Sequence, residues 1–255
     1  DYYASRGLGD VYKRQVQACM KSLQARVRKG EVEQDTGTGG SWPISSDRVV
    51  WSVAAWEAYC LTGDGDWLLR ASRVLEKTCL KDEKVLTATG GLMRGESSFL
   101  DWREQSYPAW MTSADIGDSS SLSTMILHAA ARKMLARMFR ELGMEGKARE
   151  WDGKGEALSG VIEKFFRIPG SDLYGQYLYG RGYPVLSEKV DSLGNMLCVL
   201  LGHAHGAHAA RMVAALPHCV YGIPCFHPQM PEDVAPYHNR ATWPFLEGYY
   251  AQAAA

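Results

Sequence analysis

The chain of 255 residues is near the upper length for a single hydrophobic core. Its composition, 46% hydrophobic and 22% charged, is that of an ordinary globular domain. The formal net charge of −1 gives no reason to expect a nucleic-acid partner or an anionic membrane surface. The sequence contains no run of about eighteen apolar residues, so it predicts no transmembrane helix.

The first fifteen residues differ in character from the rest. They contain "SRGLGDVYKRQ", which resembles a translated sequencing adapter or assembly artefact, so we exclude residues 1–15 from the functional argument. We therefore expect the true N-terminus, with any signal peptide, to be missing. The last residues, "FLEGYYAQAAA", read as a helix in progress, and we expect an internal fragment of a longer protein.

Helical periodicity dominates the rest of the chain. Apolar residues recur with helical spacing over 48–61, 67–79, 122–142, 151–166, 193–201 and 209–216. Three connectors are short and contain glycine (62–66, 142–146, 202–206), which is typical of αα-hairpins between antiparallel helices. The sequence therefore predicts an all-α fold of helical hairpins. The stretch "YGQYLYG" (174–180) is a candidate for a short strand or hairpin.

Most polar and aromatic clusters lie in long connections, at 37–48, 91–111, 173–184 and 221–244. If the hairpins pack side by side, these loops emerge on one face, where sites usually lie. The stretch "GESSFLDWREQSYPAWM" (95–111) carries three acids, Glu96, Asp101 and Glu104. Asp101 stands between Leu100 and Trp102, where apolar neighbours raise a carboxyl pKa and favour a general acid. Glu104 and Glu96 are the alternatives, and an ordinary loop acid that caps a turn is the structural alternative.

The same loops are rich in groups that bind sugars, since aromatic rings stack on pyranose faces and arginines and carboxylates bond hydroxyls. Structural roles stay open beside this one: Asp47 as a helix N-cap, the arginines as neighbours that neutralise the acids, and some rings as core. The expected substrate-binding residues are Trp42, Asp47, Arg48, Trp51, Arg94, Trp102, Arg103, Tyr107, Tyr177, Arg181, His238, Asn239 and Trp243.

No motif predicts a metal or cofactor. "HAHGAH" (203–208) falls at a helical turn, and its first two histidines would point apart, so we expect a solvated surface turn. GxSxG, P-loop, HExxH and DxDxDG patterns are absent from the sequence. The six cysteines form no CxxC pair, and we expect them to be buried small hydrophobes rather than a disulfide framework.

Three segments carry a resemblance to a known superfamily: "SWPISSDRVVWSVAAWEAYCLTGDGDWL", "GESSFLDWREQSYPAWM" and "GIPCFHPQMPEDVAPYHNRATWPFLEGYY". Together with the hairpins they resemble the six-hairpin glycosidases, in a bacterial branch similar to family 63 α-glucosidases and trehalases. The resemblance covers most of 37–255. It implies an incomplete (α/α)6 barrel over 16–255, with long loops on one face.

The resemblance also implies an activity. It suggests a glycoside hydrolase for oligosaccharides, and an inverting α-glycosidase in particular, with Asp101 as general acid by match to loops of the type "SGxDxxPR" or "ESGWDxS". The family's base is a glutamate beyond the helix after a "WP" motif. Only eleven residues follow "TWP" (242–244) here, so the base is expected beyond residue 255 and the fragment is expected to be inactive. Glu247 lies too early to be that base.

Two other functions stay open. One is a different carbohydrate enzyme on the same fold, such as a lyase, phosphorylase or epimerase, because fold does not determine chemistry. A lyase would use Tyr107 with Arg103, or His238 with Arg181. The other is a helical interaction module without catalysis, which predicts short loops. The expected partner is an oligosaccharide or glycoside, not nucleic acid or a membrane, and a periplasmic or extracellular location is favoured over a cytoplasmic one.

Overall fold

The computed structural model describes residues 2–34, 41–98, 106–231 and 236–255. Every predicted helix is present. The long helices are α1 (Tyr2–Ala25), α2 (Trp51–Thr62), α3 (Gly65–Leu86), α6 (Leu122–Glu141), α7 (Glu145–Phe166), α8 (Ser192–Leu200), α9 (Gly206–Ala215) and α11 (Pro244–Ala254). Short helices α5 (Ser113–Asp118) and α10 (Pro236–Arg240) and the 3-10 turns η1 (Asp47–Val50) and η2 (Thr89–Gly91) lie in the long connections.

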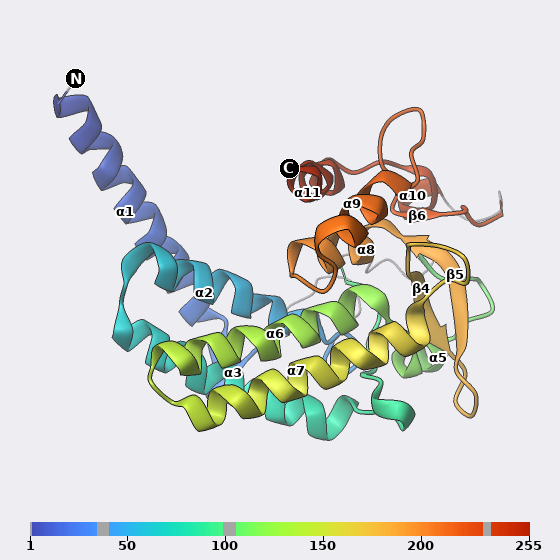
Figure 1. Ribbon diagram of the computed structural model, residues 1–255, viewed down its shortest axis with the longest axis horizontal. Helices are drawn as coiled ribbons and strands as arrows, with labels where there is room; N and C mark the ends of the chain where they lie inside the picture. The colour runs from blue at the N-terminus through green and yellow to red at the C-terminus, as the bar shows by residue number, and fades with distance from the viewer. Residues whose placement is uncertain (1, 35–40, 99–105, 232–235) are drawn as a thin grey trace.

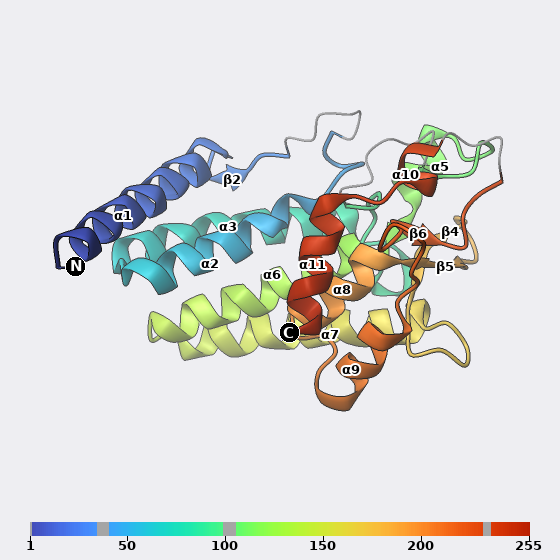
Figure 2. The same ribbon diagram turned by 90° about the horizontal axis from the view of Figure 1, so that it is seen from above.

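The predicted hairpin turns are confirmed. Helix α2 ends at Gly63, whose φ of 65° is left-handed, a backbone conformation that costs less free energy for glycine than for other residues. Asp64 then caps α3, because its side chain accepts a hydrogen bond from the Trp67 N–H at 2.9 Å. Gly143 (φ 72°) turns α6 into α7 in the same way. In Figure 2 the α2/α3 and α6/α7 turns lie at one end of the molecule, and the long connections gather at the opposite end.

The helices form an incomplete (α/α)6 barrel. Helices α2, α6, α8 and α11 follow one another in an open arc, each in contact with the next. Helices α3 and α7 pack against α6, and α9 packs against α8 and α11. Helix α1 packs against α2, and its N-terminal part extends away from the other helices (Figure 1). Side chains 11–15 are exposed and Val16 is buried, while the assignment of residues 1–15 to an artefact stays a prediction.

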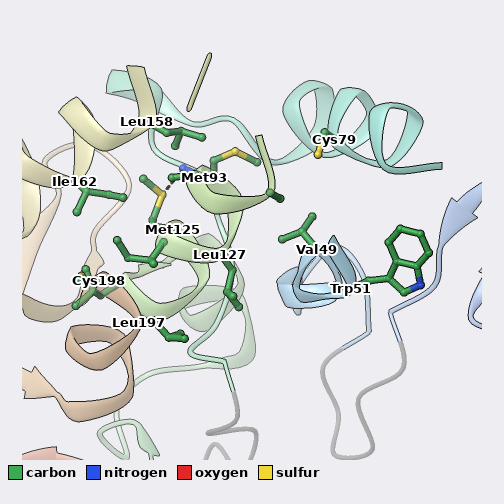
Figure 3. Close-up of a cluster of buried hydrophobic side chains, with 14 of the residues drawn as sticks. Val49, Trp51, Cys79, Met93, Met125, Leu127, Leu158, Ile162, Leu197 and Cys198 are labelled. Carbon is green, nitrogen blue, oxygen red and sulfur yellow. Dashed lines mark hydrogen bonds between the residues drawn. The ribbon is translucent and has the colours of Figure 1, made fainter. Parts of the chain in front are cut away.

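The core fills the space between these helices, as Figure 3 shows for one part of it. Apolar side chains from η1, α3, α6, α7 and α8 meet there, and the Met93 N–H lies 3.2 Å from the sulfur of Met125. Trp67 and Trp151 are almost fully buried, and burial of a large apolar side chain stabilises a fold by roughly 1.5–3 kcal/mol. All six thiols are free; Cys79, Cys198 and Cys225 are buried as expected, but the other three are exposed.

A four-stranded antiparallel sheet joins the long connections. Its order is β3 (Ser120–Ser121), β4 (Gly175–Tyr179), β5 (Val185–Asp191) and β6 (Phe226–His227). The register pairs Ser121 with Tyr177 and Asp191 with Phe226. The candidate strand at 174–180 is therefore confirmed as β4, whereas the sequence did not predict the other three strands of the sheet. A two-stranded ribbon, β1 (Val27–Arg28) with β2 (Glu31–Val32), follows α1.

The predicted loop face is confirmed through the described parts of the four long loops. The Glu96 N–H donates to the Ile44 carbonyl at 3.1 Å, which joins the first loop to the second. The Gly95–Ser120 bridge joins the second loop to β3, and the sheet continues from β3 to the third and fourth loops. Helices α5 and α10 and the strands of this sheet gather at the same end of the molecule (Figure 2). No described helix has the length and hydropathy that a bilayer span requires.

Candidate active site on the loop face

Glu96 is held at the centre of the loop face. Its side chain is buried, and its Oε1 accepts a short hydrogen bond from the Ser45 hydroxyl. Its carbonyl accepts from Ser121 Oγ at 2.9 Å and from Thr124 Oγ1 at 2.6 Å, so the first turn of α6 supports it from below. Side-chain hydroxyl groups of this kind provide hydrogen bonds to backbone carbonyl groups of a loop that has no helix or sheet partners for them. One candidate catalytic acid is therefore fixed where the first two loops meet the barrel.

The residues that follow Glu96 continue this polar layer. The Ser98 N–H donates to Ser123 Oγ at 3.0 Å, and the Ser97 N–H donates to the Tyr107 hydroxyl at 2.8 Å. Tyr107 is almost fully buried, and burial raises its pKa well above the usual value, with the nearby charge of Glu96 acting in the same direction. Tyr107 therefore stays protonated and anchors the loop.

The fourth loop meets the second through an aromatic and polar cluster. His238 Nδ1 lies 2.9 Å from Ser106 Oγ, and its ring centroid is 4.6 Å from Tyr237 and 5.4 Å from Trp243. Asn239 is fully buried, and its Oδ1 accepts from the Met230 N–H at 2.7 Å. His238 and Trp243 thus lie on the loop face, and Asn239 holds the fourth loop together; their contacts with a ligand stay a prediction.

A second buried carboxyl lies in this layer, and sequence reasoning missed it. Asp191 ends β5 directly before α8 and is 1% exposed. Burial raises its pKa to about 6, and the Gly194 N–H and Ser123 offset the shift only in part. Within the described ranges, both amide atoms of buried Gln176 and the Ser192 hydroxyl have no hydrogen-bond partner. Unsatisfied buried groups are rare and call for a reason such as function.

The sequence signal for Asp191 was weak because an aspartate before a helix reads as an ordinary N-cap. Its side chain makes no such cap hydrogen bond. Gln176 lies at an irregularity between Gly175 and Tyr177 in the pairing of β4 with β5. Bulges of this kind redirect a side chain, and no residue pattern in "YGQYLYG" indicated one.

Four predicted site residues, Asp101, Trp102, Arg103 and Glu104, fall outside the described residues. The two ends of that segment, Ser98 and Ser106, are anchored by hydrogen bonds to the α6 and α10 sides of the face.

The predicted site residues of the first loop and the start of α2 have structural contacts. Arg48 is buried in an ion pair with Asp82 at 2.5 Å, and it also donates to the Val32 carbonyl at 2.8 Å. Trp42 donates its indole N–H to Asp82 at 2.9 Å, and Trp51 donates its own to the Leu23 carbonyl at 3.0 Å. These side chains hold α1, α3 and the ribbon together. Arg48, Trp51 and half-buried Trp42 thus have structural roles here, and their predicted contacts with sugar stay a prediction.

Asp47 and the two tyrosines have structural contacts as well. Asp47 accepts from the Gln34 amide at 2.5 Å, and Ser46 rather than Asp47 precedes η1. Tyr107 and Tyr177 are buried with their ring centroids 5.1 Å apart, so the packing alternative applies to both.

Two predicted arginines meet at the rim of the face. Arg94 and Arg181 both pair with Asp118, at 3.5 Å and 2.8 Å. They line one cavity of about 350 Å³ together with Leu178, Gly180 and Pro184. Both guanidinium groups are substantially exposed, so these two residues remain available to a ligand.

The histidine-rich turn is not a simple solvated surface. The His203 side chain is 6% exposed and its Nε2 lies 2.9 Å from Glu163 Oε1. Burial lowers the pKa of His203, and Glu163 opposes this effect. Within the described ranges, no three histidine, cysteine, aspartate or glutamate side chains gather as metal ligands.

Glu247 accepts a hydrogen bond from the Ile223 N–H at 2.7 Å and so holds the fourth loop.

Comparison with known proteins identifies the fold and not a family. No family model matches the chain, and no curated protein matches it. Among solved structures, it is similar to the GH78 family rhamnosidase of Bacillus sp. GL1, with 15% identity and a TM-score of 0.56 over 81% of this chain and 19% of that one. It is also similar to a protein named Sialidase, with 14% identity and a TM-score of 0.57 over 83% of this chain and 19% of that one.

A third structure, the GH76A α-1,6-mannanase of Salegentibacter sp. HEL1_6, is 12% identical, with 82% of this chain and 62% of that one covered. Its TM-score of 0.45 is too low to carry an argument. The chain spans about a fifth of the length of the first two structures. The helical-hairpin fold is therefore shared with glycoside hydrolases, and the activity has to be argued from the site.

Proposed function

We propose that this chain forms part of a glycoside hydrolase that acts on oligosaccharides. The observation that carries the proposal is the loop face: four long loops meet at one end of a helical-hairpin barrel and bring carboxyl and aromatic side chains together there. Glycoside hydrolysis needs two carboxyl groups and sugar-binding surfaces, and this fold is shared with glycoside hydrolases.

The finer mechanism is that of an inverting α-glycosidase, as the resemblance to family 63 α-glucosidases and trehalases implies. In it, Asp101 donates a proton to the leaving oxygen. The base is a glutamate, as the resemblance implies, and it would activate a water on the opposite sugar face. The support for this role is the sequence position of Asp101 between Leu100 and Trp102, where apolar neighbours raise a carboxyl pKa and favour a general acid. The periplasmic or extracellular location stays a prediction.

The alternatives receive less support from the geometry. Tyr107 is a poor lyase base because burial raises its pKa and its hydroxyl holds the Ser97 N–H. His238 is bonded to Ser106, and Arg181 is paired with Asp118, so these two are not poised together. A helical interaction module would not need loops cross-linked by a buried polar layer.

The test is made on the full-length protein with a panel of 4-nitrophenyl α-glucoside, α-mannoside and α-rhamnoside, and with the matching methyl glycosides. Asp101→Asn should lower turnover of the methyl glycoside by about 10²- to 10⁴-fold, because that leaving group needs a proton. The 4-nitrophenyl glycoside should lose far less, because its leaving group departs without protonation.

Glu104→Gln and Glu96→Gln are the matched controls. If either abolishes methyl-glycoside turnover while Asp101→Asn retains it, the general acid is that residue. If the wild-type protein hydrolyses none of the glycosides, the hydrolase proposal fails.

A further inference from the structure

An exposed aromatic pair stands on the rim of the loop face. Trp110 is 60% exposed, which is unusual for so large a ring. Its ring centroid lies 5.5 Å from that of Tyr179 on β4, with the two planes tilted by 58°. Neither residue was among the predicted site residues. Trp110 therefore offers solvent a wide flat face that is held in place by a second ring.

The pair is rigidly supported from below. Tyr179 packs against a small hydrophobic cluster made of Tyr107, Met111, Ile116 and Tyr177, which is separate from the main core. The chain enters this cluster through a turn in which the Met111 N–H donates to the Pro108 carbonyl at 3.0 Å. A platform that is already ordered loses little conformational freedom when it binds, which favours affinity.

A continuous row of rings joins this platform to the candidate active site. Trp110 contacts Tyr179, Tyr179 lies 6.1 Å from Tyr177, and Tyr177 lies 5.1 Å from Tyr107. The Tyr107 hydroxyl accepts from the Ser97 N–H, one residue beyond Glu96. Buried Tyr177 and Tyr107 thus connect the exposed platform, through the interior, to the residues beside Glu96.

The charged groups beside the platform balance. Arg181, two residues after Tyr179, forms an ion pair with Asp118, which Arg94 also contacts. The pKa of half-buried Asp115 is lowered mainly by hydrogen bonds from Thr112, with a smaller effect of Arg181. Among the described residues of this rim, Arg94 and Arg181 lie beside Asp118 and Asp115, so their charges offset one another. It offers hydrogen bonds to hydroxyl groups, which suits a neutral ligand.

We infer that Trp110 and Tyr179 form a carbohydrate subsite that stacks a pyranose ring of a neutral glycan, away from the bond that is cleaved. The apolar face of a pyranose matches an exposed indole, and the neighbouring Arg181–Asp118 pair can bond its hydroxyls. This inference rests on the proposed function for the direction of the glycan, but the stacking itself requires no catalysis.

Affinity electrophoresis tests it with full-length protein in native gels that contain soluble starch, yeast α-mannan, polygalacturonate or no polysaccharide. We expect a neutral glycan to retard the wild-type protein. Trp110→Ala should raise the apparent dissociation constant about tenfold. Trp110→Phe should keep most of the retardation because it keeps a ring. Tyr221→Ala is the matched control, since Tyr221 is 85% exposed on the fourth loop and lies outside the platform.

Three outcomes would overturn the inference: no retardation by either neutral glycan, equal retardation of the wild type and Trp110→Ala, or retardation by polygalacturonate alone. A change of oligomeric state in Trp110→Ala on gel filtration would overturn it too, because the ring would then serve a second copy. Asp101→Asn separates the two proposals, since it should bind like the wild type. Trp110-dependent retardation without any hydrolysis would refute the hydrolase and leave the subsite standing.

Discussion

Ser106 and His238 are 132 positions apart in the chain, yet the Ser106 hydroxyl lies 2.9 Å from His238 Nδ1 in the buried layer of the loop face. This contact joins the acidic second loop to the aromatic fourth loop. Each loop supplies groups that the proposed site needs, so the contact couples the stability of the two loops to the arrangement of the site.

The coupling can be measured with a double-mutant cycle. Ser106→Ala and His238→Ala should each lower the free energy of unfolding by about 1–2 kcal/mol, because each leaves a buried partner without its hydrogen bond. The double variant should lose about 1 kcal/mol less than the sum of the two. Urea unfolding gives the values, with Ser41→Ala at an exposed position as control. Strict additivity would mean that the contact contributes nothing.

Asp191 predicts a specific dependence of stability on pH. Its pKa rises from 3.8 to about 6 on folding, so between these values the folded chain keeps a proton that the unfolded chain releases. The contribution of Asp191 to the free energy of unfolding is therefore fully present below pH 3.8 and is lost as the pH rises through 6. Asp191→Asn removes the effect, and its stability relative to wild type should improve by about 2 kcal/mol between pH 4.5 and pH 7.5.

The measurement is urea unfolding of both proteins at the two pH values. Exposed Asp66→Asn is the control and should show a nearly constant difference from wild type. A constant difference for Asp191→Asn as well would mean that Asp191 titrates normally in the folded protein.

The buried pair of Arg48 and Asp82 should matter to folding far more than to sugar binding. Asp82→Ala leaves the guanidinium buried without its partner and should cost about 3–5 kcal/mol of stability. The double variant Arg48→Met/Asp82→Leu should recover much of this loss. Asp152→Ala is the control, because its pair with Arg140 is exposed, and it should cost no more than about 1 kcal/mol. Thermal unfolding compares the three, and a small loss in Asp82→Ala would contradict the assignment.

Gly95 is required by close packing beneath Glu96. A Cβ at this position would lie 2.4 Å from Ser46 Oγ and 3.0 Å from Thr124 Cγ2. Gly95→Ala should therefore lower stability by about 1–3 kcal/mol, and adding Ser46→Ala should restore part of it. Gly160→Ala on α7 meets no atom within 4 Å and should be neutral or stabilising. Thermal unfolding of all four proteins decides the point, and an unaffected Gly95→Ala would show that the loop relaxes easily.

The predictable part of this protein was local in sequence. The spacing of apolar residues was enough for α2, α3, α6, α7, α8 and α9, because an amphipathic stripe depends only on residues three and four apart. Gly63 and Gly143 marked turns because a left-handed backbone is cheapest for glycine. Helices joined alternately by short and long connections then place the long loops at one end. The sheet was less predictable, since β3 and β6 have two residues each and carry no period that could be read.

The sequence by itself therefore determined the helical hairpins, the loop face and the types of residue on that face. Tertiary structure decided which of those residues are free to meet a ligand. Arg48 forms an ion pair with Asp82, which is 34 positions further along the chain. Tyr107 and Tyr177 pack against each other and are buried, whereas Trp110 is exposed to solvent. Asp191 acquired its raised pKa only because α6, α8 and β6 close around it. The physical reason is that burial and pairing depend on neighbours from distant elements, which the periodicity of one segment does not record.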